Sequence, residues 1–346
     1  MTNKILRVTG LLFCCFILLS TLAGWMNKPT KVETADIKRS VVKSLALLQP
    51  SGYIFTSNSA LKCASCHHNT LLSMAAALAV KKGIPVIDSF TTERTATMER
   101  TIKQYCNPNN LPGFITGANL ISPYVLLGLH SENYAPNRYT DVCVDYLMTQ
   151  AKPDGSFLTE SGRPPIETGE MHLAAMCIRA IQLYAAPAKK NAVNELVTRS
   201  KAWFEKSNTN DQQELAFQLL GLQWCGSSKE MKMKIVARLK AIQHEDGGWS
   251  QLPTMKSDAY ATGQTLYALY ESGVIKPKDE VYQKGLNYLL KTQNDEGAWI
   301  VATRAYAIQP FVNSQFPPYD ENQFISAAAT NWATMALLNA LPDKGK

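Results

Sequence analysis

The 346-residue sequence lacks the features that mark several large classes of protein. Its formal net charge is +7, but it has no run of Lys and Arg of the kind that follows a phosphate backbone, so nucleic acid is not an expected partner. No alternation of apolar and polar residues typical of strands occurs between Asp36 and Leu341. Charged residues make up 18% and hydrophobic residues 46% of the chain, which excludes the disordered and collagen-like classes. A large helical globular protein is therefore expected.

The N-terminus has the pattern of an export signal. Lys4 and Arg7 precede an apolar run over residues 8–23, and polarity rises after it. This pattern predicts either a signal peptide cleaved after the small residue Ala23 or an uncleaved membrane anchor. In both cases the folded part lies in the periplasm or at the outer face of the inner membrane. The sequence divides into a leader over 1–23, a linker over 24–35 and a single folded domain over 36–346.

The region after the linker contains helix-length segments with apolar residues three and four apart, separated by Pro, Gly, Asn and Asp. The clearest unit is a helix ending at Gln243, an Asp-Gly-Gly turn ending at Trp249, and a second helix. It is repeated with Gln293 and Trp299, which are again six residues apart. Weaker copies bring the total to six helix pairs. The predicted pairs are 45–49 with 67–80, 91–105 with 120–129, 146–150 with 172–184, 191–204 with 212–224, 235–243 with 257–270, and 286–293 with 327–338.

The motif Cys63-Ala-Ser-Cys66-His67-His68 is the attachment signature of c-type haem, in which two thiols bond to the haem vinyl groups and the imidazole ligates the iron. On a helix, the two thiols and His67 would face one side. A disulfide, a metal site without haem, and inert thiols remain alternatives. Because haem is attached outside the cytoplasm, the export signal favours haem c as cofactor, with His67 as its proximal ligand.

Six cysteines lie outside the leader, an even number that allows a framework of disulfides. A domain of this size does not need such bonds for stability. Cys143, Cys177 and Cys225 lie in apolar helical stretches, and we expect each of them to be a small buried thiol.

The six helix pairs resemble the α/α toroid of squalene-hopene cyclases, oxidosqualene cyclases and protein prenyltransferase β subunits. The two Gln-to-Trp units look like the QW motifs of the cyclase branch. The chain is also similar to an exported bacterial branch that carries Cys-x-x-Cys-His-His before its first inner helix. The resemblance implies an all-α (α/α)6 toroid, whose inner helices run parallel around a mostly apolar cavity and begin at one rim.

The resemblance does not extend to the catalytic groups of the family. The Asp-x-Asp-Asp run that serves cyclases as acid is missing, and only Asp258 stands in a comparable inner-helix position. The Asp, Cys and His that bind zinc in prenyltransferases have no counterpart set. Asp258 is therefore a weak candidate catalytic acid, since a fold does not fix a function.

Several further residues are candidates for the rim of the cavity. His172 and Met171 are the first choices for a second axial ligand, ahead of His130 and Met74. His68 points about 100° away from His67 on a helix, so its role is either functional or that of a helix-start residue bonded to a loop carbonyl. Further candidates for the cavity wall are Arg163 and Glu167, expected to pair with each other, Tyr260, and Arg304 in the long insertion before the last helix.

Three hypotheses follow. The first is an exported haem c protein acting in electron transfer with a periplasmic redox partner, in redox sensing, or in oxidation of an apolar small molecule. The second is a haem-free module that binds a lipid or isoprenoid in the toroid. The third is a cyclase-like enzyme that uses Asp258.

Overall fold

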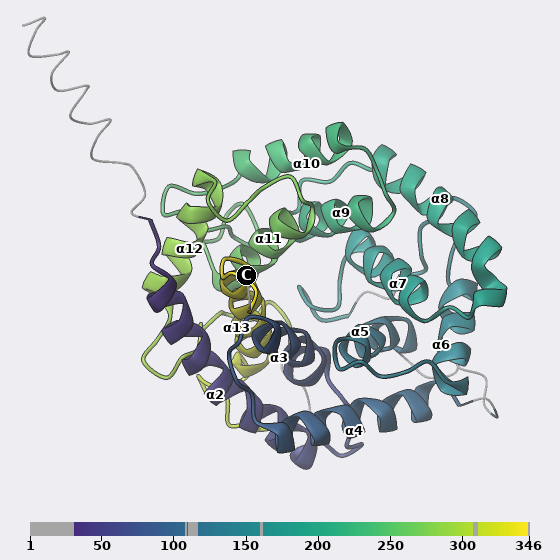
Figure 1. The fold of residues 1–346 in the computed structure, drawn as a ribbon, viewed down its shortest axis with the longest axis horizontal. Helices are drawn as coiled ribbons and strands as arrows, with labels where there is room; N and C mark the ends of the chain where they lie inside the picture. Colours follow the sequence, from purple (N-terminus) through teal and green to yellow (C-terminus); the bar gives the residue numbers. More distant parts are fainter. Residues whose placement is uncertain (1–30, 108, 110–116, 160–161, 307–310, 345–346) are drawn as a thin grey trace, which may run out of the picture.

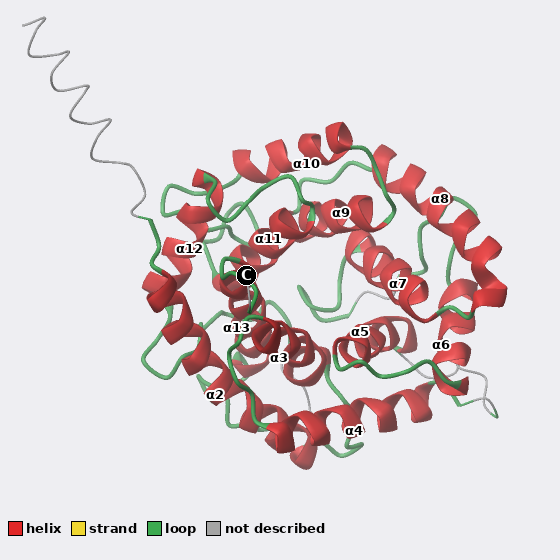
Figure 2. Cartoon of the chain, viewed as in Figure 1, coloured by secondary structure: helices red, strands yellow, loops and turns green. Residues whose placement is uncertain are grey.

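The structure is a computed structural model that describes residues 31–107, 109, 117–159, 162–306 and 311–344. Within these residues the chain forms twelve α-helices, and its β-type contacts are two isolated bridges. Helices therefore account for the regular structure (Figure 2). The predicted leader and residues 24–30 of the predicted linker lie outside the described residues, and the first described helix begins at Thr34. No helix in the described ranges has the length and apolar character needed to cross a membrane.

The helices form two concentric rings (Figure 1). The outer ring contains α2 (Thr34–Asn58), α4 (Asp88–Tyr105), α6 (Arg138–Thr149), α8 (Lys190–Lys206), α10 (Lys229–Ala241) and α12 (Glu280–Thr292). The inner ring contains α3 (Leu71–Lys81), α5 (Ala118–Ser131), α7 (Glu170–Tyr184), α9 (Gln212–Trp224), α11 (Ala259–Glu271) and α13 (Gln323–Asn339). Two short helices, η1 (Cys66–Thr70) and η3 (Pro187–Lys189), precede α3 and α8. The predicted (α/α)6 toroid and its six helix pairs are confirmed.

The ring is closed by its last helix. α13 packs against α11 on one side and against α3 and α2 on the other, so the two ends of the folded chain meet. Every residue of α13 is buried, whereas α12 buries only one face, with Val281, Tyr282, Gly285, Leu286 and Leu289. This difference is what two concentric layers require, because an inner helix is covered all round and an outer helix on one side.

The tryptophans of the two QW units complete the ends of their own outer helices. Trp249 Nε1 donates to the carbonyl of Leu239 in the last turn of α10, at 2.7 Å. Trp299 Nε1 donates to the carbonyl of Leu289 in α12, at 2.8 Å. The last four carbonyls of a helix have no partner within the helix, and the Trp249 indole satisfies one of them. The Trp299 indole adds a second hydrogen bond to the Leu289 carbonyl, which also accepts the backbone N–H of Gln293.

The glutamines of the same units join neighbouring outer helices. Gln243 Nε2, just after α10, donates to the carbonyl of Val281 in α12 at 2.9 Å. Gln293 Nε2, just after α12, donates to the carbonyl of Ser40 in α2 at 3.0 Å. The repeated spacing in the sequence therefore encodes the contact between successive helix pairs, including the contact that closes the ring.

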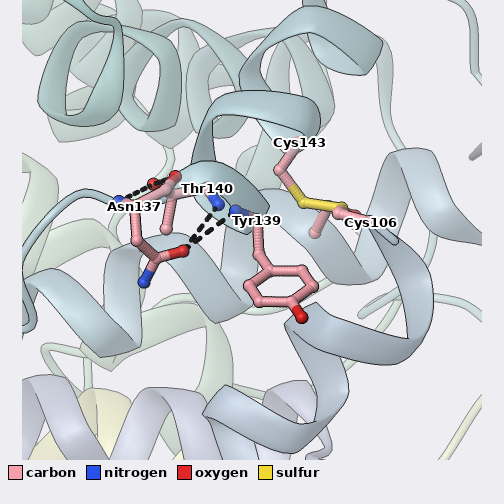
Figure 3. The surroundings of a disulfide bond; sticks show 6 residues. Cys106, Asn137, Tyr139, Thr140 and Cys143 are labelled. Atoms are coloured by element: carbon pink, nitrogen blue, oxygen red, sulfur yellow. Dashed lines mark hydrogen bonds between the residues drawn. A yellow bond between two sulfur atoms is a disulfide. The ribbon is translucent and has the colours of Figure 1, made fainter. Parts of the chain in front are cut away.

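One expectation about cysteine is wrong. Cys143 is not a free thiol but forms a disulfide with Cys106 across 37 residues, with 5.2 Å between the two Cα atoms (Figure 3). Helical periodicity places Cys143 on the buried face of α6, but it does not show that the end of α4 lies opposite. Cys177 and Cys225 are free and buried, as expected.

Candidate functional site

The Cys-x-x-Cys-His-His segment leads into the inner helix α3. Ser65 is the N-cap, with its Oγ accepting the backbone N–H of His68 at 3.0 Å, and η1 begins at Cys66. Cys63 therefore lies before the helix rather than on it. The expectation that both thiols and His67 share one helix face is wrong, because the serine cap starts the helix three residues after Cys63.

The three residues nevertheless line one cavity. Its volume is about 510 Å³, within the range of about 300–1,000 Å³ usual for small-molecule and cofactor sites. The cavity wall is mostly apolar, and Arg163 and Glu167 are its charged residues. Among the apolar side chains are Phe55, Leu120, Ile121, Val312 and Phe324.

Both thiols of the motif are free and neutral. The structure has no disulfide between Cys63 and Cys66. Burial raises the pKa of both thiols, that of Cys66 to about 12, and Cys63 Sγ donates to Gln104 Oε1 at 3.1 Å. Thiolate is the form that binds metals, so this environment does not favour a thiolate site. No group of three or more His, Cys, Asp or Glu suited to a metal ion occurs in the described part of the chain.

His67 is a buried neutral imidazole with one nitrogen engaged. Burial, together with the nearby Arg163 cation, lowers its pKa to about 3. Its Nδ1 lies 2.5 Å from Nδ1 of His68 and 3.3 Å from Oγ of Ser65. Its backbone carbonyl accepts from Asn331 Nδ2 at 3.0 Å. Nε2 of His67 makes no hydrogen bond with the described residues, and neutral imidazole is the form that ligates a metal.

His68 differs from the expectation of a residue bonded to a loop carbonyl. Its Nε2 lies 2.9 Å from Oγ of Ser314, and its ring stacks on Phe55 with the ring centres 4.9 Å apart. The side chain is 1% exposed. His68 is therefore held on both ring nitrogens, and it is not among the residues that line the cavity.

The loop between α6 and α7 carries the predicted ion pair into the site. It reaches into the middle of the ring (Figure 1), where Gln213 Nε2 donates to the carbonyls of Pro165 and Thr168, both at 2.9 Å. Arg163 Nε donates to Glu167 Oε2 at 2.7 Å, and a second contact joins Nη2 to Oε1. The predicted pairing is confirmed. His67, Arg163 and Glu321 also line a smaller cavity, so the starts of α3 and α13 and this loop meet at one rim.

The structure does not bring the two preferred axial ligands to His67. His172 Nδ1 donates to the carbonyl of Thr168 at 3.0 Å, so its Nε2 accepts the hydroxyl of Tyr124 at 2.7 Å. Neither His172 nor Met171 is among the residues that line the 510 Å³ cavity. The other two candidates lie on the inner helices, His130 in the last turn of α5 and Met74 in α3.

Asp258 lies at the start of α11 as its N-cap. Oδ1 accepts the backbone N–H of Ala261 at 2.9 Å, and Oδ2 accepts from Gln251 Nε2 at 3.2 Å. Burial raises the pKa of this carboxyl. Arg304 Nε donates to Gln251 Oε1 at 2.9 Å. Both oxygens of Asp258 are thus used by the fold, and the buried Tyr260 hydroxyl donates to a glutamine of α9 at 2.8 Å.

The structure also contains a carboxyl that the sequence does not single out. Glu214 of α9 accepts the backbone N–H groups of Met171 and His172 at 3.0 and 3.3 Å, and so caps the neighbouring helix α7. Burial raises its pKa to about 7. With Asp211 and Arg304 it lines a second cavity of about 400 Å³. The Asp-x-x-Glu spacing indicates a helix start, but not that the side chain reaches α7.

Comparison with known proteins identifies the architecture. No protein-family model matches the chain. The structure matches the type II terpene cyclase MstE from Scytonema with a TM-score of 0.58 and 13% identity, over 90% of this chain and 99% of the cyclase. The fold is that of the type II terpene cyclases. A variant of the Scytonema cyclase in complex with its substrate, geranylgeranyl dihydroxybenzoate, gives a TM-score of 0.59 and 13% identity, covering 89% of this chain and 98% of the variant.

Two further relatives agree with this terpene-cyclase-like fold. A protein from Actinoplanes matches with a TM-score of 0.59 and 12% identity, over 90% of this chain and 100% of that protein. In sequence, the chain is 36% identical to the squalene–hopene cyclase of Zymomonas mobilis over 77 residues. That match spans 19% of this chain and 11% of the cyclase, so the likeness establishes the type of fold and not the reaction.

Proposed function

We propose that this protein is an exported toroid that carries one covalently attached c-type haem at the rim of its cavity. The observation that carries the proposal is that two free thiols and an imidazole with an unengaged Nε2 line the same 510 Å³ cavity. Cys63, Cys66 and His67 are also the residues that the attachment motif requires. The residues present therefore fit the cofactor.

Each residue of the motif has a distinct task. Cys63 and Cys66 would add across the two vinyl groups, with sulfur bonding to one carbon and the thiol hydrogen to the other, so no oxidant is consumed. His67 would bind the iron through Nε2, while its Nδ1 remains hydrogen-bonded within the protein. Arg163, which is paired with Glu167 on the cavity wall, would be the cation available to the carboxylates of the group. A bound haem supplies one-electron chemistry and a site for a small ligand.

The surroundings of His67 favour some roles over others. Within the described part of the wall, no second His or Met faces the cavity, and His172 is held by Tyr124 and Thr168. A haem held here through His67 would supply redox and ligand-binding chemistry, and redox sensing or oxidation of an apolar molecule is therefore proposed ahead of simple electron transfer. The apolar wall fits such a molecule.

The disulfide supports export. Disulfides persist in oxidising compartments and are rare in the cytoplasm, and the Cys106–Cys143 bond joins two outer helices. Together with the basic and apolar N-terminal pattern, this supports a location in the periplasm or at the outer face of the inner membrane. Haem attachment to Cys-x-x-Cys-His requires the same compartment.

The test is production of the full chain together with a cytochrome c maturation system, followed by visible spectroscopy and an in-gel haem stain. We expect a Soret band and a stain that survives denaturation, both lost in Cys63→Ala/Cys66→Ala. Cys177→Ala is the matched control, because Cys177 is a free buried thiol of α7 outside the motif. Absence of the Soret band, or a stain that persists in the double variant, would overturn the proposal.

A second candidate function is binding of an isoprenoid or other lipid without haem. It is favoured by the apolar wall of the cavity and by the similar toroid of the Scytonema cyclase, which binds geranylgeranyl dihydroxybenzoate. Solvent extraction of the purified protein, followed by mass spectrometry, tests it. A stoichiometric lipid in protein without haem would support this candidate over the first.

A further inference from the structure

We propose that His68, Ser314 and Gln323 form a hydrogen-bond relay that fixes the tautomer of His67, with the proton on Nδ1 and the lone pair on Nε2. The relay runs from α13 to the start of α3 through residues 246 positions apart in the sequence. It deepens the proposed function, because Nε2 is the nitrogen assigned to the iron. The argument for the tautomer itself rests on the protein atoms alone.

The relay begins at Gln323, whose amide orientation is fixed from two sides. Its Nε2 donates to the carbonyl of Asp320 at 3.0 Å, and its Oε1 accepts the backbone N–H of Ser314 at 2.7 Å. A flipped amide would place two acceptors together at Asp320 and two donors together at Ser314. Oε1 therefore faces Ser314, and a carbonyl oxygen can only accept.

The hydroxyl of Ser314 must then point toward Gln323. Ser314 Oγ lies 2.5 Å from Gln323 Oε1, so the hydroxyl hydrogen lies between these two oxygens. Oγ is left with lone pairs for its other neighbour, Nε2 of His68, at 2.9 Å. Nε2 of His68 therefore carries a proton and donates to Ser314.

A neutral imidazole carries one proton, so Nδ1 of His68 is an acceptor. It lies 2.5 Å from Nδ1 of His67, and a hydrogen bond at this position requires His67 to donate. Nδ1 of His67 is therefore protonated, and Nε2 holds a bare lone pair. In the alternative arrangement, Ser314 would donate to His68 and His68 would donate to His67. The oxygens of Ser314 and Gln323 would then be in contact without a hydrogen between them.

The contacts of Ser65 are compatible with this assignment. Its Oγ accepts the backbone N–H of His68 at 3.0 Å and donates to Asn69 Oδ1 at 3.4 Å. The amide of Asn69 is oriented by its Nδ2, which donates to the carbonyl of Gly52 at 3.3 Å. With the Ser65 hydroxyl hydrogen turned to Asn69, Ser65 Oγ can accept a share of the His67 Nδ1–H across their 3.3 Å contact, while His68 accepts the main hydrogen bond.

The relay makes His68 a positioning residue. A histidine ring can carry its proton on either nitrogen, and the hydrogen bond made by one nitrogen decides which of them is free to act as ligand. The stacking of His68 on Phe55 and the burial of Ser314 and Gln323 keep the chain of groups in place. His67 thus has Nε2 ready for a ligand before any cofactor arrives.

The test is long-range proton–nitrogen NMR on the full chain with ¹⁵N-labelled histidine, produced without a haem-attachment system. We expect a protonated Nδ1 and an unprotonated Nε2 for His67. Ser314→Ala should move the tautomer ratio toward the Nε2–H form by roughly five-fold, as loss of one net hydrogen bond predicts. Ser314→Thr keeps the hydroxyl that accepts from His68 and should retain the tautomer. Ser200→Ala, at a buried serine of the outer helix α8, is the matched control.

A proton on Nε2 in the unaltered protein would overturn the relay. So would an unchanged ratio in Ser314→Ala when circular dichroism shows an intact fold. These outcomes are independent of haem attachment. The Nδ1–H tautomer without a Soret band in matured protein would support the relay and reject the haem proposal. The Nε2–H tautomer in protein that does give a Soret band would reject the relay and support the haem proposal.

Discussion

His67 combines burial with access to a cavity. Its low pKa keeps the ring neutral, and Ser65 and His68 occupy one of its two ring nitrogens, Nδ1. A metal-binding histidine depends on a partner at its other nitrogen for orientation and basicity. His67 has that partner from the protein alone, which separates it from His172, whose two nitrogens are both engaged.

The residues of the motif could be predicted from the sequence, but their support could not. The spacing of Cys63, Cys66 and His67 is local, and so is the pairing of Arg163 with Glu167 four residues away. Ser314 lies 246 residues from His68, and a serine in a loop gives no sign of such a partner. The sequence also misplaces Cys63 on the helix, because the capping role of Ser65 depends on the local backbone.

Glu214 makes a prediction about pH. Its pKa is raised from 4.5 to about 7 by burial, so between these values the folded state holds a proton that the unfolded state has released. Its contribution to stability is therefore lost as pH rises from about 4.5 to about 7, and is on the order of 3 kcal/mol. Glu214→Gln removes this titration, so its free energy of unfolding should not fall in the same way. In urea unfolding, the difference in unfolding free energy between the variant and the unaltered protein should therefore change by this amount, in favour of the variant, from pH 4.5 to pH 8.

Glu245→Gln, at an exposed carboxyl, is the control and should leave the pH dependence unchanged. Parallel curves for Glu214→Gln and the unaltered protein would mean that Glu214 is ionised throughout this range. In that case the 400 Å³ cavity would hold an ordinary surface carboxylate.

At the level of elements, the helix pairs could be predicted from the apolar periodicity and from the repeated spacing of Gln and Trp. Each repeated QW unit forms the same contact, a glutamine hydrogen bond to the next outer helix. The order of the inner helices around the ring also follows from the repeat. Periodicity does not predict how closely two neighbouring helices approach each other. α11 and α13 pack through Gly263, where an added Cβ would lie 2.6 Å from backbone atoms of Trp332 and Ala333.

This close approach predicts a contrast between two helical glycines. Gly263→Ala would press against the backbone of α13, which cannot yield, and should cost about 1–3 kcal/mol or more in unfolding free energy. Gly285→Ala in α12 meets only the flexible end of Leu266, 2.8 Å away, and regains helix propensity. Denaturant unfolding of both variants checks this, and equal costs would contradict the packing of α11 against α13.

At the scale of the whole molecule, the toroid brings the start of α3, the loop before α7 and the start of α13 to one rim. Type II terpene cyclases share this architecture, while Asp258 of this chain serves as a helix cap. The same scaffold can therefore present different chemistry at its rim, because the site depends on a few residues and the rings on repeated packing.

The disulfide between α4 and α6 makes a prediction at this scale. With the Cys106–Cys143 bond formed, a reductant should lower the free energy of unfolding by about 2–4 kcal/mol through the freedom it restores to the unfolded chain. Cys106→Ala/Cys143→Ala should be insensitive to reductant. An unfolding midpoint that stays the same when mass spectrometry shows the bond to be reduced would contradict a stabilising role.

The measurement that tests the central claim most directly is the intact mass of the purified, denatured protein after production with a cytochrome c maturation system. The account predicts a mass greater than that of the polypeptide by one haem, and no increase for Cys63→Ala/Cys66→Ala. A mass equal to that of the bare polypeptide, from cells in which a known c-type cytochrome is fully matured, would contradict covalent haem at this rim.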